Sequence, residues 1–326
     1  MKRREFLASS VALGSAALLP MPAIAQSRAL IVAEPARSVG YLPLYLAIRE
    51  GYFSQSGLEV SVLTAEQNGA AINAALAGQA FAFIGGPERV AFARAQGGHL
   101  RSVVNCVDRG NVYFMAAQGT SPTDGDIAGF MRGKRIAVGP RGTSPHSVMH
   151  YVLEAELGVG YDEVTLIEAP SSAALAVVAS GRADIAVGAE PQISQGVEQG
   201  IWDEPFYNVP RELGPLAYSV LNVSLQSIEE EPQLVTDFVA GIRMALEATH
   251  ADHDLALDVA RAEFPTMAPQ ELEATLDRSF ADDVWSADGM ISTQSWEMMH
   301  SVVRQIGALA TDVPYDDVID MRFLTV

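Results

Sequence analysis

The sequence predicts an α/β protein built from two similar lobes. Short apolar runs alternate with amphipathic segments of helical length, and the same order of segments occurs twice along the chain. The clearest repeat is the phrase GQAFAFIGGPE at residues 78–88, which returns as GRADIAVGAEP at residues 181–191. In each copy a glycine is expected to end a helix, and a short apolar strand then runs into small residues.

The elements expected in each half follow one plan. In the first half, strands are expected at residues 30–33, 58–65 and 81–84, with helices at 44–50 and 69–77. In the second half, strands are expected at residues 135–138, 164–168 and 185–187, with helices at 147–157 and 173–180. Strands that alternate with helices pair in parallel, so each lobe should hold a mainly parallel sheet flanked by helices.

Two extended runs, at residues 100–118 and 216–226, can carry the chain from the first lobe to the second and back. Two such crossings predict a hinge with a cleft beside it. Later helices, expected to pack on the first lobe, cover residues 256–263, 269–280 and 293–309. The predicted boundaries are therefore a first part of lobe 1 at 26–108, lobe 2 at 109–217, and the return crossing with the C-terminal helices of lobe 1 at 218–326.

Residues 1–25, MKRREFLASSVALGSAALLPMPAIA, have the basic start, apolar middle and small-residue end of an export signal. The apolar middle is too short to span a bilayer. Arg3-Arg4 resembles the twin-arginine type, which implies the twin-arginine export machinery as a partner; an ordinary signal that happens to hold two arginines is the alternative. We expect cleavage near Ala25 and a mature protein in the periplasm.

The charge balance argues against a nucleic-acid partner. The chain has 326 residues with a formal net charge of −19, whereas phosphate binding needs clustered Lys and Arg. Lys2 and Lys134 are the only lysines, so arginine is the main cation, and its planar donor group suits oxyanions. The single cysteine, Cys106, excludes an intrachain disulfide. We expect a monomer.

Three segments resemble the solute-binding proteins of ABC importers, in the nitrate–sulfonate–taurine and thiamine-pyrimidine group. They are GYLPLYLAIREGYFSQSGLEVSV at residues 40–62, ALAGQAFAFIGGPE at 75–88, and GRADIAVGAEP at 181–191. The resemblance implies a two-lobed type II periplasmic binding fold with a two-crossing hinge. It also implies capture of a small polar solute, sulfonate-like or pyrimidine-like, and its delivery to an ABC permease and its ATPase.

The turns that follow the strands are where a ligand is expected. In open α/β sheets ligands bind beyond the carboxyl ends of the strands, where free N–H groups at helix starts attract anions. GPRGTSPH at residues 139–146 is the richest of these turns. The candidate ligand-binding residues are Arg37, Ser38, Gly40, Tyr41, Gln67, Asn68, Gly85, Gly86, Glu88, Arg109, Arg141, Thr143, Ser144, His146 and Glu190.

Several of these residues have a purely structural alternative. Tyr41 could be a packing tyrosine, and the polar residues of the turns could simply cap helices. Glu190 could read an amine or an N–H-rich ring edge, or it could pair with Arg109 or Arg141. The mixture of Arg and Glu favours a zwitterion or a polar heterocycle over a simple inorganic anion.

Enzyme and metal functions have weaker support. His146, His150 and Glu154 share one face of a predicted helix, but the glutamate that a zinc hydrolase places beside its first histidine is absent, so no metal is predicted. Enzymes that make a thiamine pyrimidine on the resembled fold use a cysteine-rich motif and an aldehyde-binding lysine. Cys106 is the only cysteine here and Lys134 is the only lysine after the expected signal, so we expect no enzyme and no cofactor. A ligand sensor for a receptor kinase is the remaining alternative.

Overall fold

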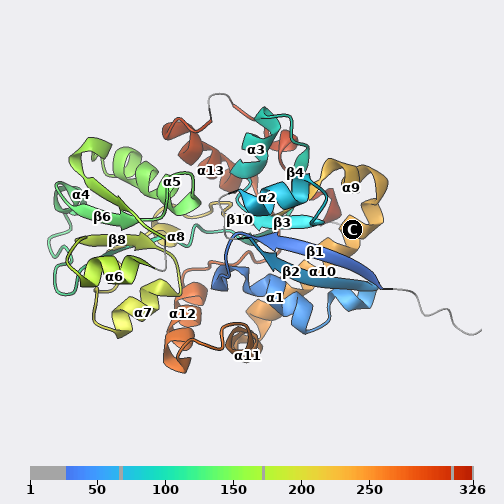
Figure 1. Cartoon of the computed structure of the whole chain (residues 1–326), viewed down its shortest axis with the longest axis horizontal. Helices are drawn as coiled ribbons and strands as arrows, with labels where there is room; N and C mark the ends of the chain where they lie inside the picture. The colour runs from blue at the N-terminus through green and yellow to red at the C-terminus, as the bar shows by residue number, and fades with distance from the viewer. Residues whose placement is uncertain (1–26, 66–68, 171–172, 310–311, 325–326) are drawn as a thin grey trace, which may run out of the picture.

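The computed structural model describes residues 27–65, 69–170, 173–309 and 312–324, and these residues form two five-stranded sheets (Figure 1). The strands of the first sheet, in spatial order, are β2 (Leu58–Thr64), β1 (Arg28–Glu34), β3 (Ala82–Gly85), β10 (Ser219–Ser224) and β4 (Leu100–Val107). Those of the second are β7 (Thr165–Glu168), β6 (Arg135–Val138), β8 (Ile185–Gly188), β5 (Tyr113–Ala116) and β9 (Tyr207–Asn208). The predicted two-lobed α/β architecture is confirmed.

Each sheet is parallel except for one strand. In the first sheet β1 pairs in parallel with β2 and β3, whereas β10 runs antiparallel to β3 and β4. In the second, β6 pairs in parallel with β7 and β8, whereas β5 runs antiparallel to β8 and β9. The reversed strand in each sheet is the one that the chain enters from the other sheet.

Helices flank both sheets (Figure 1). In the first half they are α1 (Leu42–Arg49), α2 (Ala70–Leu76) and α3 (Glu88–Ala95), and in the second α4 (Ile127–Met131), α5 (Ser144–Tyr151), α6 (Ala174–Ala179), α7 (Gln192–Glu198) and α8 (Val209–Glu212). Of these, α1, α2, α5 and α6 correspond to the four helices that the sequence predicts in the two halves. Gly78 and Gly181 follow α2 and α6 with φ angles of 69° and 68°. This left-handed conformation suits glycine, and it explains why the repeated phrase begins with one.

The C-terminal helices are α9 (Leu225–Glu230), α10 (Pro232–Ala251), α11 (His253–Glu263), α12 (Pro269–Ala281) and α13 (Thr293–Gln305). Helices α10 and α11 pack against α1 in the first lobe, as expected. Helix α12 packs against both α11 and α7, and α13 packs against both α3 and α5. These two helices therefore touch both lobes, and Figure 1 shows them on opposite sides of the junction.

The two crossings between the lobes lie side by side. The backbone N–H of Leu216 donates to the carbonyl oxygen of Asp108 (2.7 Å), and that of Tyr218 donates to Val107 (3.0 Å). A Cβ atom at Gly110 would lie 2.4 Å from Cδ2 of Leu216, so glycine permits this close approach. Within the described residues, no helix has the length and apolar character needed to cross a membrane.

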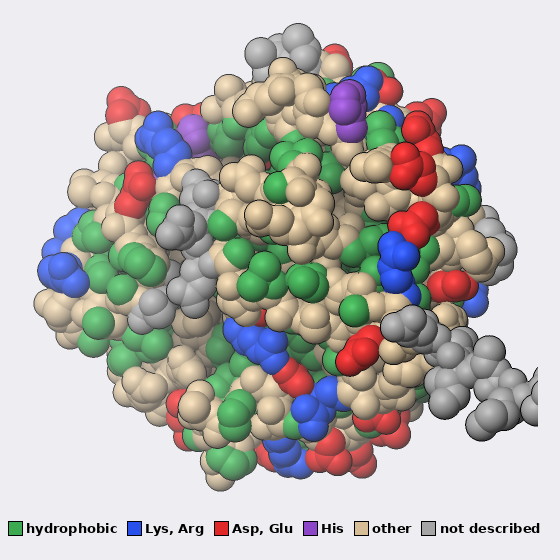
Figure 2. Space-filling model, turned by 45° about the vertical axis from the view of Figure 1, so that its right-hand side comes forward, with side chains coloured by type: hydrophobic (Ala, Val, Ile, Leu, Met, Phe, Trp, Pro, Cys, Tyr) green, Lys and Arg blue, Asp and Glu red, His purple; other side chains and the backbone are tan. Residues whose placement is uncertain are grey.

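Surface arginines are mostly paired with carboxylates. Arg28 lies 3.0 Å from Glu231, and Arg49 lies 3.1 Å from Glu263. Figure 2 shows basic side chains lying beside acidic ones on the face that it draws. This mixed pattern differs from the clustered positive charge that phosphate backbones require.

We predict that Gly196→Ala destabilises the second lobe. Gly196 lies in α7, and a Cβ atom there would come 1.9 Å from Cε2 of Trp202, whose buried indole donates to the Ile193 carbonyl oxygen at 2.9 Å. Because this ring cannot easily move, we expect the free energy of unfolding to fall by about 1–3 kcal/mol in urea denaturation.

Gly188→Ala is the matched control, because its new methyl group would meet its nearest atom, Cδ1 of Ile193, at 3.9 Å. A Gly196→Ala protein that is as stable as this control would contradict the packing argument.

Candidate ligand-binding site

The turns that follow β3 and β6 meet across the junction between the lobes. The hydroxyl of Ser144, the first residue of α5, donates a hydrogen bond to Oε1 of Glu88, the first residue of α3 (3.0 Å). Both residues were predicted as ligand candidates from their positions beyond the strand ends. The structure brings them together although the strands that they follow lie in different sheets.

Only one of the two carboxylate oxygens of Glu88 accepts a hydrogen bond from another residue. Its side chain is buried with a residue exposure of 4%, and Oε2 has no hydrogen-bond partner among the described residues. Burial raises the pKa of this carboxyl, while the charge of Arg89 lowers it. A Cβ atom at Gly86 would lie 1.9 Å from Oε2, so the predicted glycine makes room for the carboxylate.

Two buried tyrosines, Tyr41 and Tyr218, lie within reach of the charge of Arg89, the residue after Glu88. Burial raises the pKa of Tyr41 to about 12, and Arg89 lowers it. Burial also raises the pKa of Tyr218, with Tyr41 and Glu88 adding to the increase and Arg89 opposing it. Both phenols therefore stay protonated at neutral pH and can donate hydrogen bonds.

Arg89 was not among the predicted residues. It is half-buried, and its side chain forms no hydrogen bond or ion pair with any residue in the described part of the chain. Its charge nevertheless acts on Tyr41, Glu88 and Tyr218. A cation in the first turn of a helix opposes the helix dipole, and this unfavourable placement was a signal in the sequence that could have identified it.

The turn after β1 and the first crossing complete this region. The hydroxyl oxygen of Ser38 accepts from the N–H of Gly40 (3.2 Å), whose carbonyl oxygen accepts from the indole of Trp285 (3.2 Å). A Cβ atom at Gly40 would lie 3.2 Å from Nδ2 of Asn111, a buried residue of the crossing. Gly85, the last residue of β3, lies beneath the Arg89 side chain, 3.6 Å from its Cδ by the same measure.

Other predicted residues have different partners, and one of them, Arg109, lies 3.8 Å from Asp283 just after α12. Arg37 contacts Glu263, lies 3.6 Å from Glu34, and stacks over the ring of Tyr45 at 4.3 Å. Arg109 donates to the carbonyl oxygen of Pro210 (3.1 Å). Gln67 and Asn68 lie outside the described residues.

The polar side chains of the turn before α5 likewise contact neighbouring residues of the second lobe. Thr143 donates to the carbonyl oxygen of Pro140 (2.8 Å), and the guanidinium of Arg141 lies 6.0 Å from the ring centre of Tyr161. His146 is buried, with Nδ1 at 2.9 Å from the Gly139 carbonyl oxygen and Nε2 at 2.8 Å from the Tyr161 hydroxyl. Both ring nitrogens of His146 are therefore occupied.

The histidine column does not converge on a metal site. His150 lies 3.1 Å from Glu154 one turn away, but in the described part of the chain no three His, Cys, Asp or Glu side chains gather as metal ligands.

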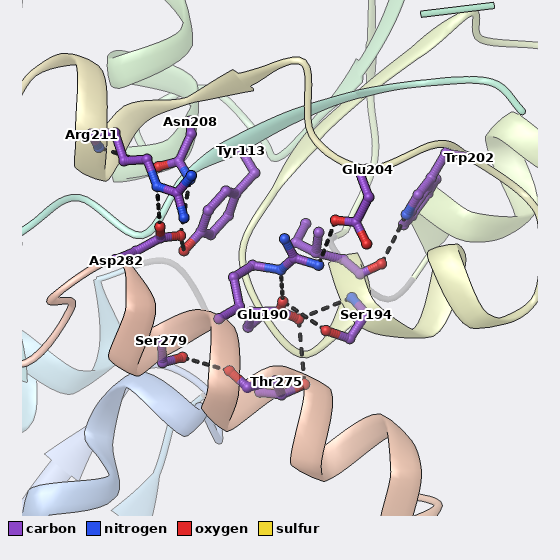
Figure 3. Close-up of polar contacts among 12 residues, drawn as sticks. Tyr113, Glu190, Ser194, Trp202, Glu204, Asn208, Arg211, Thr275, Ser279 and Asp282 are labelled. Atoms are coloured by element: carbon purple, nitrogen blue, oxygen red, sulfur yellow. Dashed lines mark hydrogen bonds and ion pairs between the residues drawn. The ribbon is translucent and has the colours of Figure 1, made fainter. Parts of the chain in front are cut away.

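Glu190 belongs to a buried network that joins the second lobe to α12 (Figure 3). Its carboxylate accepts from Nε of Arg278 (2.7 Å) and from both the N–H (3.0 Å) and the hydroxyl (2.8 Å) of Ser194. The predicted alternative of a pair with Arg109 or Arg141 is therefore wrong. The partner comes from α12 because that helix packs across the lobe junction.

A second carboxylate cluster lies at the end of α12 (Figure 3). Asp282 accepts hydrogen bonds from the hydroxyl of Tyr113 (3.0 Å), Nδ2 of Asn208 (2.9 Å) and Nε of Arg211 (2.6 Å). Arg278 also pairs with the exposed Glu204 (2.8 Å). We call these contacts, from Glu190 to Asp282, the α12 anchor.

We predict that Arg278→Met costs about 3 kcal/mol of stability, because it leaves the buried Glu190 carboxylate without its cation. Burial raises the pKa of Glu190 and Arg278 lowers it, so the variant raises it further. The deficit is present where Glu190 must be ionised, and it shrinks as the pH falls through the raised pKa of the variant and the carboxyl takes up a proton.

Glu204→Gln is the control for this prediction, since it breaks only the exposed pair and should cost less than about 1 kcal/mol. Equal losses in chemical denaturation of the two variants, or a deficit in Arg278→Met that does not depend on pH, would count against the buried ion pair.

The two sheets and the two crossings between them form a two-lobed type II periplasmic binding fold. Polar groups of both lobes face each other beyond the strand ends. A sequence model described as "NMT1/THI5 like" matches residues 39–256. The chain belongs to this NMT1/THI5-like family.

The chain is also similar to individual proteins in sequence or in fold. YtlA of Bacillus subtilis (strain 168), named as a candidate binding protein, is 23% identical over 294 residues, which cover 89% of this chain and 86% of YtlA. The alkanesulfonate-binding protein SsuA from Xanthomonas axonopodis pv. citri, solved with MOPS, superposes with a TM-score of 0.72 at 18% identity, covering 91% of this chain and 99% of SsuA. The desulfurization enzyme DSZB superposes with a TM-score of 0.67 at 18% identity, covering 91% and 97%.

Proposed function

We propose that this protein captures a small polar organic solute between its two lobes and delivers it to an ABC permease and its ATPase. The observation that carries the proposal is the junction itself. Glu88 and Ser144 join the two lobes there, beside a buried carboxylate oxygen that the described residues leave without a partner. The family membership and the SsuA-like fold support the same function.

The mechanism in this proposal is hinge closure. The crossings at residues 108–112 and 213–218 bend, and the turns after β3 and β6 close on the solute. Uptake at micromolar solute needs about 8 kcal/mol of binding free energy, which a few convergent hydrogen bonds and ring contacts can supply. The predicted residues that we assign to the site are Gly40, Tyr41, Gly85, Gly86, Glu88 and Ser144; the Glu88–Ser144 contact and the close packing at the glycines support this assignment.

The proposal includes a location. Residues 1–25 act as a twin-arginine export signal, and the mature monomer, with lobe boundaries at 26–108, 109–217 and 218–326, works in the periplasm. The signal-like sequence of residues 1–25 supports this part, as do the periplasmic relatives.

We predict that the right solute both stabilises and compacts the protein. In a thermal-shift screen of sulfonates, amino acids, nitrate, pyrimidines and riboflavin, a ligand at 100 times its Kd adds about 2.7 kcal/mol of stability and raises Tm. Small-angle scattering with that ligand should give a smaller radius of gyration. A radius that stays unchanged under saturating ligand is the result that contradicts closure.

The likeness to DSZB favours an enzyme as the second candidate. Cys106 is the single cysteine in the sequence and would have to supply any thiol nucleophile. It lies fully buried in β4, and burial raises its pKa to about 12. A thiol in such a site stays protonated and unreactive. This argues for binding over thiol chemistry.

Cys106 provides a direct test. We expect the native protein not to react with Ellman's reagent at about pH 8 and to react fully in guanidinium chloride. Cys106→Ala should bind the solute with unchanged affinity. Rapid labelling of the native thiol would instead support the enzyme hypothesis.

A further inference from the structure

Two side chains of opposite charge at the start of α3 have hydrogen-bonding atoms that no described residue satisfies. Glu88 and Arg89 are the first two residues of this helix. Oε2 of Glu88 is buried and accepts no hydrogen bond from the described residues, and the side chain of Arg89 forms no hydrogen bond or ion pair with them. Buried charged groups are normally paired, because leaving one unsatisfied costs free energy that a ligand can recover.

Both side chains fold back over the same strand end. Oε2 of Glu88 lies 1.9 Å from the position that a Cβ atom of Gly86 would take, and Cδ of Arg89 lies 3.6 Å from that of Gly85. Consecutive Cα atoms are about 3.8 Å apart, so the two side chains stand above neighbouring points of the chain. A solute that reaches both needs only a few atoms between its own charges.

The other charged candidates near the junction already have partners. Glu190 is held by Arg278 and Ser194, and Arg109 donates to Pro210. Glu88 and Arg89, in contrast, can engage a solute without breaking an existing side-chain contact.

We propose, on the basis of the solute-binding function above, that the solute is a small zwitterion whose ammonium group binds Glu88 and whose acidic group, a carboxylate or a sulfonate, binds Arg89. Ser144 fixes Oε1 of Glu88 and directs Oε2 to the ammonium group, so that closure of the lobes completes the site. The charge of Arg89 acts on both Tyr41 and Tyr218, whose neutral hydroxyls can donate to the acidic group.

Calorimetry with matched probes tests this proposal. β-Alanine and taurine carry both charges, whereas propionate and ethanesulfonate keep the acid and lack the ammonium. We expect at least one zwitterion to bind and its singly charged counterpart to bind about 10–100-fold more weakly, the value of a charged hydrogen bond. Comparing the two pairs distinguishes a carboxylate from a sulfonate.

Variants assign the two roles. Glu88→Gln should remove the difference between each zwitterion and its counterpart, and Arg89→Gln should weaken every acidic probe about tenfold or more. Gly86→Ala displaces Oε2 of Glu88 without changing any charge, so it should weaken only the zwitterions. Arg94→Gln, on the last turn of the same helix and paired with Asp317, is the control that should change no affinity.

Three results would overturn the inference: equal binding of a zwitterion and its counterpart, a preference that survives in both Glu88→Gln and Gly86→Ala, or no binding of either zwitterion at millimolar concentration. If a solute of another class still compacts the protein in scattering, the solute-binding function stands and only this inference fails. If no solute of the panel compacts it, the function itself is rejected.

Discussion

The chain crosses between its two sheets from carboxyl edge to carboxyl edge, and the position of the site depends on this constraint. Strand β4 ends at Val107, and β5 begins at Tyr113 opposite Gly188, the last residue of β8. On the return, Val220 at the start of β10 lies opposite Gly85, the last residue of β3. Residues 108–112 span less than about 20 Å even when fully extended, so the loops beyond the strands of both sheets must face each other.

Three buried glutamates differ in how many of their carboxylate oxygens accept hydrogen bonds. Glu34 accepts from the hydroxyls of Tyr45 (2.5 Å) and Thr64 (2.7 Å) inside the first lobe. Glu190 is satisfied by Ser194 and Arg278 between the second lobe and α12. Glu88 uses only one oxygen. Since burial is similar in all three, the missing partner, rather than burial, marks Glu88 as a residue for a ligand.

Local patterns in the sequence were sufficient to predict the sheets and the glycines that end α2 and α6, because those features depend on neighbouring residues. The same reasoning found Glu88 and Ser144, since both follow strands whose ends must converge. It missed Arg278 as the partner of Glu190, because the choice depends on how α12 packs across the junction, far along the chain. His146 was predicted as a ligand residue, yet the structure gives both its nitrogens to neighbours in its own lobe.

The position of Asp282 affects how the lobes can move. Its hydrogen-bond partners flank the hinge: Tyr113 directly follows the first crossing, and Asn208 and Arg211 lie just before the second. Two peptide connections alone would let one half swivel and slide relative to the other. Asp282 adds a third point of attachment, on a helix that also contacts the first lobe. With three attachments, rotation of the lobes about a single axis is the motion that costs the least free energy.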